Sequence, residues 1–188
     1  EQAGAQYVIK YKKAPVLHIE ANGYGLGAAE SKTKSPEFVR YLHEDYTMLS
    51  GKRLHCTNDA NEYAVMIDDR TRLVLRLYNN GVAFRYELTG MNNETLPEER
   101  TAYIIPEGIN RWVQRWTEPY EAFFPHATTG ESRDHRWGYP ALFEPQEGIF
   151  ALISEADISR RQSASCLRND GNVERYRVCP DKNDLKLT

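Results

Sequence analysis

The sequence predicts a mostly β fold of the sandwich type, built from antiparallel sheets with little helix. Three observations predict it. Short segments rich in β-branched and aromatic residues recur along the 188 residues. One pair of segments, over residues 72–88, alternates apolar and polar side chains with the period of a half-buried strand. Only one segment, Ser35–Leu42, has the features of a helix start.

The first strand signals lie near the N-terminal end. Tyr7–Tyr11 is an extended segment, and Val16–Ile19 resumes the pattern after Lys12-Lys13-Ala14-Pro15, so we predict a hairpin with a short turn. The glycines of Asn22–Gly27 have a spacing similar to that of a phosphate-binding loop. Because no clear helix and no Lys-Ser/Thr pair follow them, we predict a turn there.

One segment favours a helix. Ser35 stands at an N-cap position and Pro36 at the first helical position, where its fixed φ and its missing N–H are tolerated. We therefore predict a short helix over Ser35–Leu42.

The strongest local signal is a hairpin over residues 72–88. Leu73, Leu75 and Leu77 share one face of the first strand, and the second strand alternates in the same way over Val82–Leu88. Asn80-Gly81 is the dipeptide typical of a type I′ turn, which needs two positive φ angles. We predict this hairpin with that turn.

Further strands are predicted downstream, and the region between them is expected to be irregular. Residues 115–140 contain three prolines and two glycines among many aromatic side chains. Because no repeat or linker is visible, residues 1–188 are predicted to form a single domain. The abrupt start at Glu1 and the strand-like end at Asp184–Thr188 lead us to expect that it belongs to a longer polypeptide. The further strands are predicted at Glu62–Asp68, Thr101–Ile105, Arg111–Gln114, Gly148–Ile153 and Glu174–Cys179.

Composition and charge exclude two classes of function. Hydrophobic residues make up 40% and charged residues 27%, as in an ordinary globular chain. The formal net charge is -3 and no basic stripe occurs, so we expect no nucleic-acid partner. No apolar run approaches the roughly 18 residues of a membrane span, so we expect no membrane-spanning segment.

The three cysteines give a limited signal. Cys56, Cys166 and Cys179 are too few and too scattered for a disulfide framework or a zinc site. A single Cys166–Cys179 bridge, with one thiol left over, stays open as an alternative to three thiols.

The chain shows no self-contained active site. Its five histidines lack metal-ligand spacing, and neither a Gly-x-Ser-x-Gly nor a His-Glu-x-x-His motif occurs. Pairs of carboxylates, which glycoside hydrolysis uses, are too easily found among 27 acidic residues to identify a site. We therefore assign no catalytic residue to this chain.

Aromatic residues gather between residues 112 and 143, interleaved with Arg and Glu. Sugars bind on aromatic faces flanked by polar groups, and Glu121 and Trp137 are the candidate substrate contacts. Packing of large rings in the core and loops explains the same residues, so both interpretations stay open.

A second cluster follows a predicted buried strand. Ile149–Ile153 leads into Glu155 and Asp157, which places hard oxygen ligands of the kind calcium prefers at a strand end. A solvated turn after the strand is the alternative.

An ordered series of motifs resembles one enzyme family. Leu75–Glu87 resembles the R-x-Y-x-D-G-V-A-F-R-Y signature of the N-terminal domain of glycoside hydrolase family 97, with Asn80 where aspartate is usual. Ala14–Leu17 is similar to its K-P-V-L step. Tyr46–Arg53 and Asn58–Glu62, also upstream of that signature, resemble the W-x-P-x-x-G-K-R segment of the family. Downstream matches stand in the expected order at Glu118–Glu121, Trp137–Phe143 and Leu152–Asp157.

The resemblance implies a fold, a partner and a metal. Members of that family are exo-acting α-glucosidases and α-galactosidases, common in the periplasm, so we expect a periplasmic or secreted protein. Their N-terminal domain is a β-supersandwich, similar to galactose mutarotase, that docks on a catalytic (β/α)8 barrel which this chain lacks. The barrel binds the oligosaccharide substrate and holds calcium, and the N-terminal domain supplies one glutamate ligand. Glu155 is the residue that matches this ligand.

Two other functions are open. A stand-alone carbohydrate-binding module would use the aromatic stretch, and calorimetric titration with oligosaccharides would distinguish it from a docking domain. A mutarotase-like enzyme would need a His/Glu acid–base pair in one cleft, and no such pair can be named from the sequence.

Overall fold

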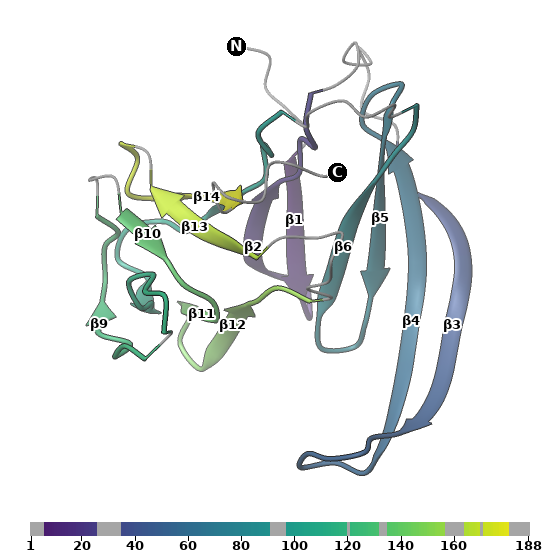
Figure 1. Cartoon of the computed structure of the whole chain (residues 1–188), viewed down its shortest axis with the longest axis horizontal. Coiled ribbons are helices and arrows are strands. Elements are labelled where there is room, and N and C mark those ends of the chain that lie inside the picture. The colour runs from purple at the N-terminus through teal and green to yellow at the C-terminus, as the bar shows by residue number, and fades with distance from the viewer. Residues whose placement is uncertain are drawn as a thin grey trace. The chain divides into compact units, whose positions relative to one another are not determined.

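The computed structural model describes residues 6–25, 35–90, 97–119, 121–131, 135–156, 164–169 and 171–180. These residues form antiparallel strands and, within the described ranges, no helix (Figure 1). The predicted mostly β fold class is therefore confirmed. The strands are β1 (Gln6–Tyr11), β2 (Ala14–Glu20), β3 (Glu37–Thr47), β4 (His55–Met66), β5 (Thr71–Leu77), β6 (Val82–Leu88), β7 (Ala102–Ile104), β8 (Asn110–Trp112), β9 (His126–Ala127), β10 (His135–Trp137), β11 (Ala141–Gln146), β12 (Ile149–Ile153), β13 (Ser165–Asn169) and β14 (Arg175–Pro180).

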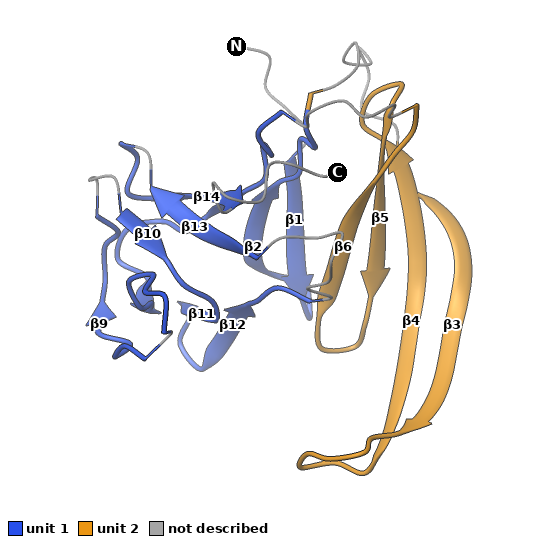
Figure 2. Ribbon diagram, viewed as in Figure 1, with its two compact units in different colours: residues 1–24, 92–188 blue, residues 25–91 orange. Residues whose placement is uncertain are grey.

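The chain divides into two compact units, which Figure 2 colours separately. Unit 1 comprises residues 1–24 and 92–188, and unit 2 comprises residues 25–91. Unit 1 holds a six-stranded sheet in the order β1-β2-β7-β14-β13-β10 and a four-stranded sheet in the order β12-β11-β8-β9. Unit 2 is a four-stranded meander, β3-β4-β5-β6. The prediction that residues 1–188 form one domain stays a prediction.

The two sheets of unit 1 pack face to face. Phe143 of β11 and Tyr176 of β14 are both buried, and their rings meet edge to face at 5.5 Å between centroids. Gln146, at the end of β11, donates from Nε2 to the carbonyl oxygen of Pro15 on β2, over 3.0 Å. Each large side chain buried here contributes about 1.5–3 kcal/mol, so this apolar interior holds the sandwich together.

The predicted N-terminal hairpin is confirmed as β1 and β2. Tyr11 pairs with Ala14, so only Lys12 and Lys13 connect the strands. Both lysines have positive φ, 48° and 74°. A two-residue connection with two positive φ angles is a type I′ turn, whose twist matches that of the paired strands.

The central hairpin is confirmed, but its predicted turn is wrong. β5 and β6 pair from Thr71 with Leu88 to Leu77 with Val82. Tyr78 donates its N–H to the carbonyl oxygen of Gly81 over 2.9 Å, which centres the turn on the two asparagines between them. Neither Asn80 nor Gly81 has a positive φ. Hairpin connections of four residues are most often built around a type I turn, which needs no positive φ.

The predicted helix over Ser35–Leu42 is also wrong, because its residues from Glu37 onward belong to β3. This strand pairs with β4 from Glu37 to Thr47, with a bulge between Phe38 and Arg40. Phe38 meets Tyr63 edge to face at 5.6 Å. Ten cross-strand pairs outweigh a capping signal worth about 1 kcal/mol.

The remaining strand predictions are confirmed, and all but that of β4 differ from the structure only by small shifts in their ends. β4 begins earlier than predicted, and β7, β8, β12 and β14 lie within one residue or two of their predicted segments. The described residues of the stretch 115–140 are mostly irregular, as expected, but they include the short strands β9 and β10. Asn22–Gly25 includes a turn, with positive φ at Gly23 and Gly25, and residues 26–27 of that prediction lie outside the described residues.

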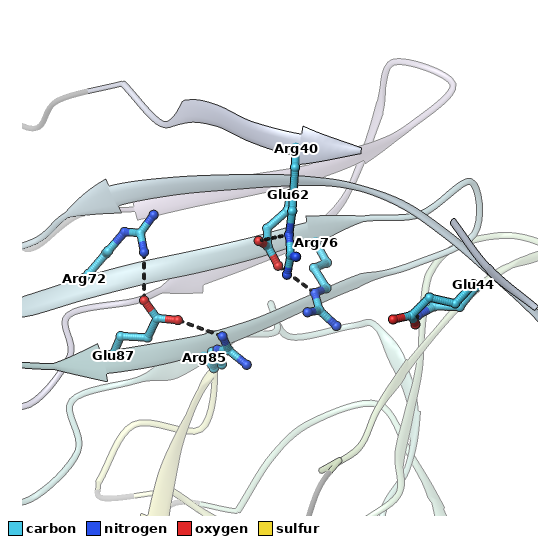
Figure 3. Close-up of polar contacts among 8 residues, drawn as sticks. Arg40, Glu44, Glu62, Arg72, Arg76, Arg85 and Glu87 are labelled. Carbon is cyan, nitrogen blue, oxygen red and sulfur yellow. Dashed lines mark hydrogen bonds and ion pairs between the residues drawn. The ribbon is translucent and has the colours of Figure 1, made fainter. Parts of the chain in front are cut away.

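A ladder of charged side chains crosses the sheet of unit 2 (Figure 3). Glu62 on β4 accepts from Nε of Arg40 on β3 and from Nε of Arg76 on β5, each at 2.9 Å. The side chain of Glu62 is only 6% exposed. Hydrogen bonds from Arg40, and then from Arg76, lower the pKa of Glu62 below its usual value although burial opposes them.

This pKa shift predicts a pH dependence of stability. A carboxylate with a lowered folded-state pKa contributes stability above its unfolded pKa of about 4.3, and loses it as the pH falls through the folded value. Glu62→Gln should cost about 1–2 kcal/mol at neutral pH, since both arginines retain access to water. The free energy of unfolding, measured with urea at several pH values between about 6 and 3, should then fall less steeply with decreasing pH in Glu62→Gln than in the parent protein. Glu37→Gln, on the exposed edge of β3, is the control; equal slopes for all three proteins would contradict the assignment.

Candidate functional site

Glu155 lies two residues after the end of β12 and turns its carboxylate to the start of β13. The backbone N–H of Ser165 lies 3.0 Å from both carboxylate oxygens, Oε1 and Oε2. The hydroxyl of Ser165 donates to Oε1 over 2.5 Å. A carboxylate bonded in this way is held in one orientation by the backbone as well as by a side chain.

The local sequence explains why Glu155 reaches this position. Ile153, the last residue of β12, is buried against the core, whereas Ser154 is exposed. Alternation along the extended chain therefore returns the next side chain toward the interior of unit 1. β12 belongs to the four-stranded sheet and β13 to the six-stranded sheet, so the Glu155–Ser165 contact ties the two sheets of the unit together.

Further oxygen atoms surround this carboxylate. The hydroxyl oxygen of Tyr139 lies 3.5 Å from that of Ser165. Burial raises the pKa of Tyr139, and the negative charges of Glu155 and Glu99 raise it further. Burial likewise raises the pKa of Tyr103, with Glu99 and Glu155 adding to the effect. Both phenols therefore stay neutral at physiological pH and present hydroxyl groups.

A second carboxylate, Glu99, belongs to the same neighbourhood. Burial is the main cause that raises the pKa of Glu99, and repulsion from Glu155 acts in the same direction, while a hydrogen bond with Thr101 opposes them. Two carboxylates that repel each other in a partly buried setting favour a proton or a cation between or beside them. We refer to Glu99, Tyr103, Tyr139, Glu155 and Ser165 as the oxygen cluster.

The donor chemistry of this cluster fits a hard cation. Each oxygen of an ionised carboxylate has two acceptor positions, so the bonds from Ser165 fill both positions on Oε1 and leave one on Oε2 of Glu155 for a metal. Calcium takes about 6–8 oxygen ligands, far more than one glutamate provides. Within the described ranges, no group of three or more His, Cys, Asp and Glu side chains could hold a metal ion. With one acceptor position left on its carboxylate, Glu155 fits the role of a single ligand.

Sequence reasoning identified only one member of this cluster. Glu155 came from the motif Ile-Ser-Glu-Ala-Asp, and Asp157 of that motif lies outside the described residues. Ser165, Tyr139 and Glu99 carry no local signal, because their proximity depends on how the sheets pack. For Glu155 the hints were a carboxylate that follows a buried strand and the match to a family motif.

The candidate substrate contacts lie in different environments. Trp137 is 4% exposed, and its indole N–H donates to Oδ1 of Asn169 over 2.7 Å. This burial does not support stacking of its ring on a sugar. Glu121 is exposed in the segment between β8 and β9. The assignment of both residues to substrate binding stays a prediction.

The aromatic stretch divides between core and surface. Phe143 is 1% exposed and packs in the sandwich, whereas Phe123 is 95% exposed. The guanidinium of Arg136 lies over the ring of Trp116 at 4.5 Å, a cation–π contact. Tyr120 lies outside the described residues. Core packing, the alternative that the sequence left open, therefore explains part of the stretch.

The fold and the cluster define a mostly β sandwich-type domain with a carboxylate held among oxygen groups between its sheets. Comparison with known proteins then gives the family. The profile described as Glycosyl-hydrolase 97 N-terminal matches residues 1–183. The chain belongs to this family, as its motifs had indicated.

Relatives of known structure and sequence agree with this assignment. A glycoside hydrolase family 97 enzyme from Pseudoalteromonas sp. strain K8, in complex with acarbose, is similar with a TM-score of 0.75 and 18% identity. A panose complex of an enzyme from the same organism gives 0.76 and 19%. Each match covers 96% of this chain and 29% of the other, and identities this low show the fold alone. A probable retaining alpha-galactosidase from Streptomyces bingchenggensis (strain BCW-1) is 31% identical over 109 residues, which are 58% of this chain and 17% of that protein.

The chain thus spans less than a third of the length of these relatives. In the described part of the chain, no helix is long and apolar enough to cross a membrane.

Proposed function

We propose that this chain acts as the non-catalytic N-terminal domain of an exo-acting α-glycoside hydrolase. In this role it docks on a (β/α)8 catalytic barrel and supplies Glu155 to a calcium ion at the active site. The single observation that carries the proposal is the fixed carboxylate of Glu155, oriented by the backbone N–H and the hydroxyl of Ser165. Family membership supports the docking role, since the solved relatives are enzymes more than three times as long as the matched part.

Glu155 would have two functions in such an enzyme. Its charge and the remaining acceptor position on Oε2 would hold the ion, and its bonds to Ser165 would make the position of the ion depend on the folded sandwich. When bound, calcium would supply positive charge that stabilises developing negative charge or orients a hydroxyl or a water. The repulsion between Glu99 and Glu155 favours a cation nearby for the same electrostatic reason.

The substrate and the compartment are part of the proposal. The similar Streptomyces protein is named a probable retaining alpha-galactosidase, so α-galactosides are the first substrates to assay and α-glucosides the second. We place the enzyme in the periplasm or outside the cell, where glycans are degraded.

Glu155→Gln in the full-length enzyme tests the proposal. Loss of the charge should raise the calcium concentration needed for half-maximal hydrolysis of a p-nitrophenyl α-glycoside by about tenfold or more. The measurement is a calcium titration after chelation, with the melting temperature recorded for each variant. Glu118→Gln, which neutralises an exposed carboxylate of the same unit, is the matched control.

Two outcomes would contradict the proposal. If Glu155→Gln responds to chelator and calcium like the parent enzyme, Glu155 is not a ligand. If the isolated 188-residue chain hydrolyses the substrate by itself, the domain is not an accessory domain.

A further inference from the structure

Two buried cysteines face each other on neighbouring strands of unit 1. Cys166 on β13 is the antiparallel partner of Cys179 on β14. Their residues are 3% and 6% exposed, and the structure has all three cysteines as thiols. The third, Cys56, lies on β4 in unit 2.

The hydrogen-bond pattern determines the spacing of this pair. Val178 donates its backbone N–H to the carbonyl oxygen of Thr101, so it points toward β7. Backbone polar groups alternate in direction along a strand, and those of Cys179 therefore point toward β13. Cys166 and Cys179 form a hydrogen-bonded pair, for which the two Cα atoms stand about 5.5 Å apart. Disulfides span Cα separations of about 4.4–6.8 Å, most often 5.5–6 Å.

The direction of the side chains agrees with the spacing. Directly opposite residues of an antiparallel pair place their Cβ atoms on the same face of the sheet, about 4.5–5.5 Å apart. A hydrogen-bonded pair lies at the wider end of this range, and disulfides need Cβ atoms about 3.5–4.5 Å apart, so the two strands have to approach by about 1 Å at this rung. Rotation about each Cα–Cβ bond then directs the two sulfur atoms toward each other.

We propose that Cys166 and Cys179 form a disulfide that staples β13 to β14 when the protein folds in an oxidising environment. One thiolate attacks a low-molecular-weight disulfide such as oxidised glutathione and releases one glutathione thiol. The second thiolate then attacks the protein sulfur of the mixed disulfide. This step forms the Cys166–Cys179 bond and releases the second glutathione thiol. Two cysteine thiols are oxidised, one small disulfide is reduced to two thiols, and the protons balance.

Burial determines when the reaction takes place. Since the finished fold shields both sulfur atoms, the exchange occurs before or while the two strands pair, when a small disulfide still reaches the thiols. A native protein kept under reducing conditions should therefore react slowly with oxidised glutathione, and a refolding one quickly.

The proposed disulfide lies next to the oxygen cluster. Ser165, whose N–H and hydroxyl hold the carboxylate of Glu155, immediately precedes Cys166 on β13. A bond at this rung fixes the start of β13 to β14, and so fixes the group that orients Glu155. This consequence rests on the proposed function, whereas the formation of the disulfide does not.

The test uses the protein carrying Cys56→Ser, so that only one pairing can form. It is unfolded, then refolded once with oxidised and reduced glutathione and once with dithiothreitol. Refolding with glutathione should give a mass lower by two hydrogen atoms, no thiol that alkylates in denaturant, and a linked peptide containing Cys166 and Cys179. The oxidised protein should melt roughly 5–10 °C above the reduced protein, since a bridge across this short loop restricts the unfolded chain.

A double variant, Cys166→Ala with Cys179→Ala in the Cys56→Ser protein, is the control and should melt at the same temperature with and without reductant. Two alkylatable thiols after oxidative refolding would overturn the proposal. A linked protein that melts no higher than its reduced form would overturn the stapling role. Neither measurement involves glycosidase activity, so failure here is distinct from failure of the calcium assignment.

Discussion

Gly130→Ala should destabilise unit 1 by about 3 kcal/mol or more, because the added methyl group has no room. A Cβ atom at this position would lie 2.0 Å from the backbone carbonyl oxygen of Val173 and 3.1 Å from the hydroxyl oxygen of Tyr176. The nearest atom belongs to the backbone, so a side-chain rotation cannot relieve the contact. The segment would have to move away from β14.

Movement there would break a set of contacts between loops. Gly108 donates its N–H to the carbonyl oxygen of Thr128 over 2.8 Å, and the hydroxyl of Thr129 donates to Oε1 of Glu107 over 3.0 Å. Glu107 in turn donates its N–H to Oε1 of Glu174 over 2.9 Å. A displaced Gly130 therefore loosens three loops together rather than one.

The measurement is urea unfolding together with the melting temperature, which should fall by roughly 6–12 °C. Gly81→Ala is the control. Gly81 has an ordinary φ, and a Cβ atom on it would have no atom within 4 Å beyond its chain neighbours, so its replacement should change stability by less than about 0.5 kcal/mol. A neutral Gly130→Ala would mean that the loops of unit 1 lie further apart than the structure has them. A strongly destabilising Gly81→Ala would indicate that Gly81 has a positive φ, as the type I′ turn predicted from the sequence requires.

Periodicity predicted the sheets because it is a local property. The alternation over Leu73, Leu75 and Leu77 is visible in the sequence, and it places β5 in a half-buried sheet whatever else the chain does. Turn type depends on register, which is set by pairing along the whole hairpin. Leu77 pairs with Val82 and leaves four residues between the strands, so the turn is centred on Asn79 and Asn80 instead of on Asn80 and Gly81. The positive φ angles that I′ geometry needs occur instead at Lys12 and Lys13, where the connection has two residues.

The helix prediction failed for a related reason. Ser35 and Pro36 give a capping signal within one helical turn, but Arg40 belongs to a contact with Glu62, 22 positions away. Contacts at such separations are invisible to a local pattern and contribute more than the cap. The edge strand β3 is therefore specified by its partner β4 rather than by its own sequence.

The candidate site shows the same limit. Glu155 could be singled out because a carboxylate followed a buried strand and matched a family motif. Its partner Ser165 is ten positions away, across residues that include some outside the described ranges. Glu99 is still more distant in the sequence and precedes Glu155, and only packing of the two sheets brings its charge near Glu155. A single sequence thus yields the ligand candidate but not the groups that orient it.

Arg111→Met should cost unit 1 about 2–4 kcal/mol, the second large effect that the structure predicts. Arg111 is 0% exposed. Its guanidinium donates to the carbonyl oxygen of Pro106 over 2.7 Å, to that of Ile109 over 3.2 Å and to that of Thr128 over 3.4 Å. A fourth bond goes to the hydroxyl oxygen of Tyr176 over 2.9 Å.

Methionine fills much of the same volume but donates no hydrogen bond. Three carbonyl oxygens and the buried hydroxyl of Tyr176 would lose this donor, and each polar group left buried without a partner costs about 1–3 kcal/mol. Removal of a buried charge offsets part of that cost, because an unpaired cation is expensive to bury. The loss should exceed the offset, since one guanidinium satisfies four acceptors from two separate loops and from β14.

Urea unfolding of three variants separates these contributions. Arg115→Met is the matched control, because its side chain is 55% exposed and its ion pair with Glu131 lies at the surface, so its loss should cost less than about 1 kcal/mol. Tyr176→Phe keeps the charge and removes one acceptor, and should cost about 1 kcal/mol. If Arg111→Met proves as stable as the parent protein, the cost of burying the charge cancels the four bonds, and the loops of unit 1 are held by their apolar contacts instead.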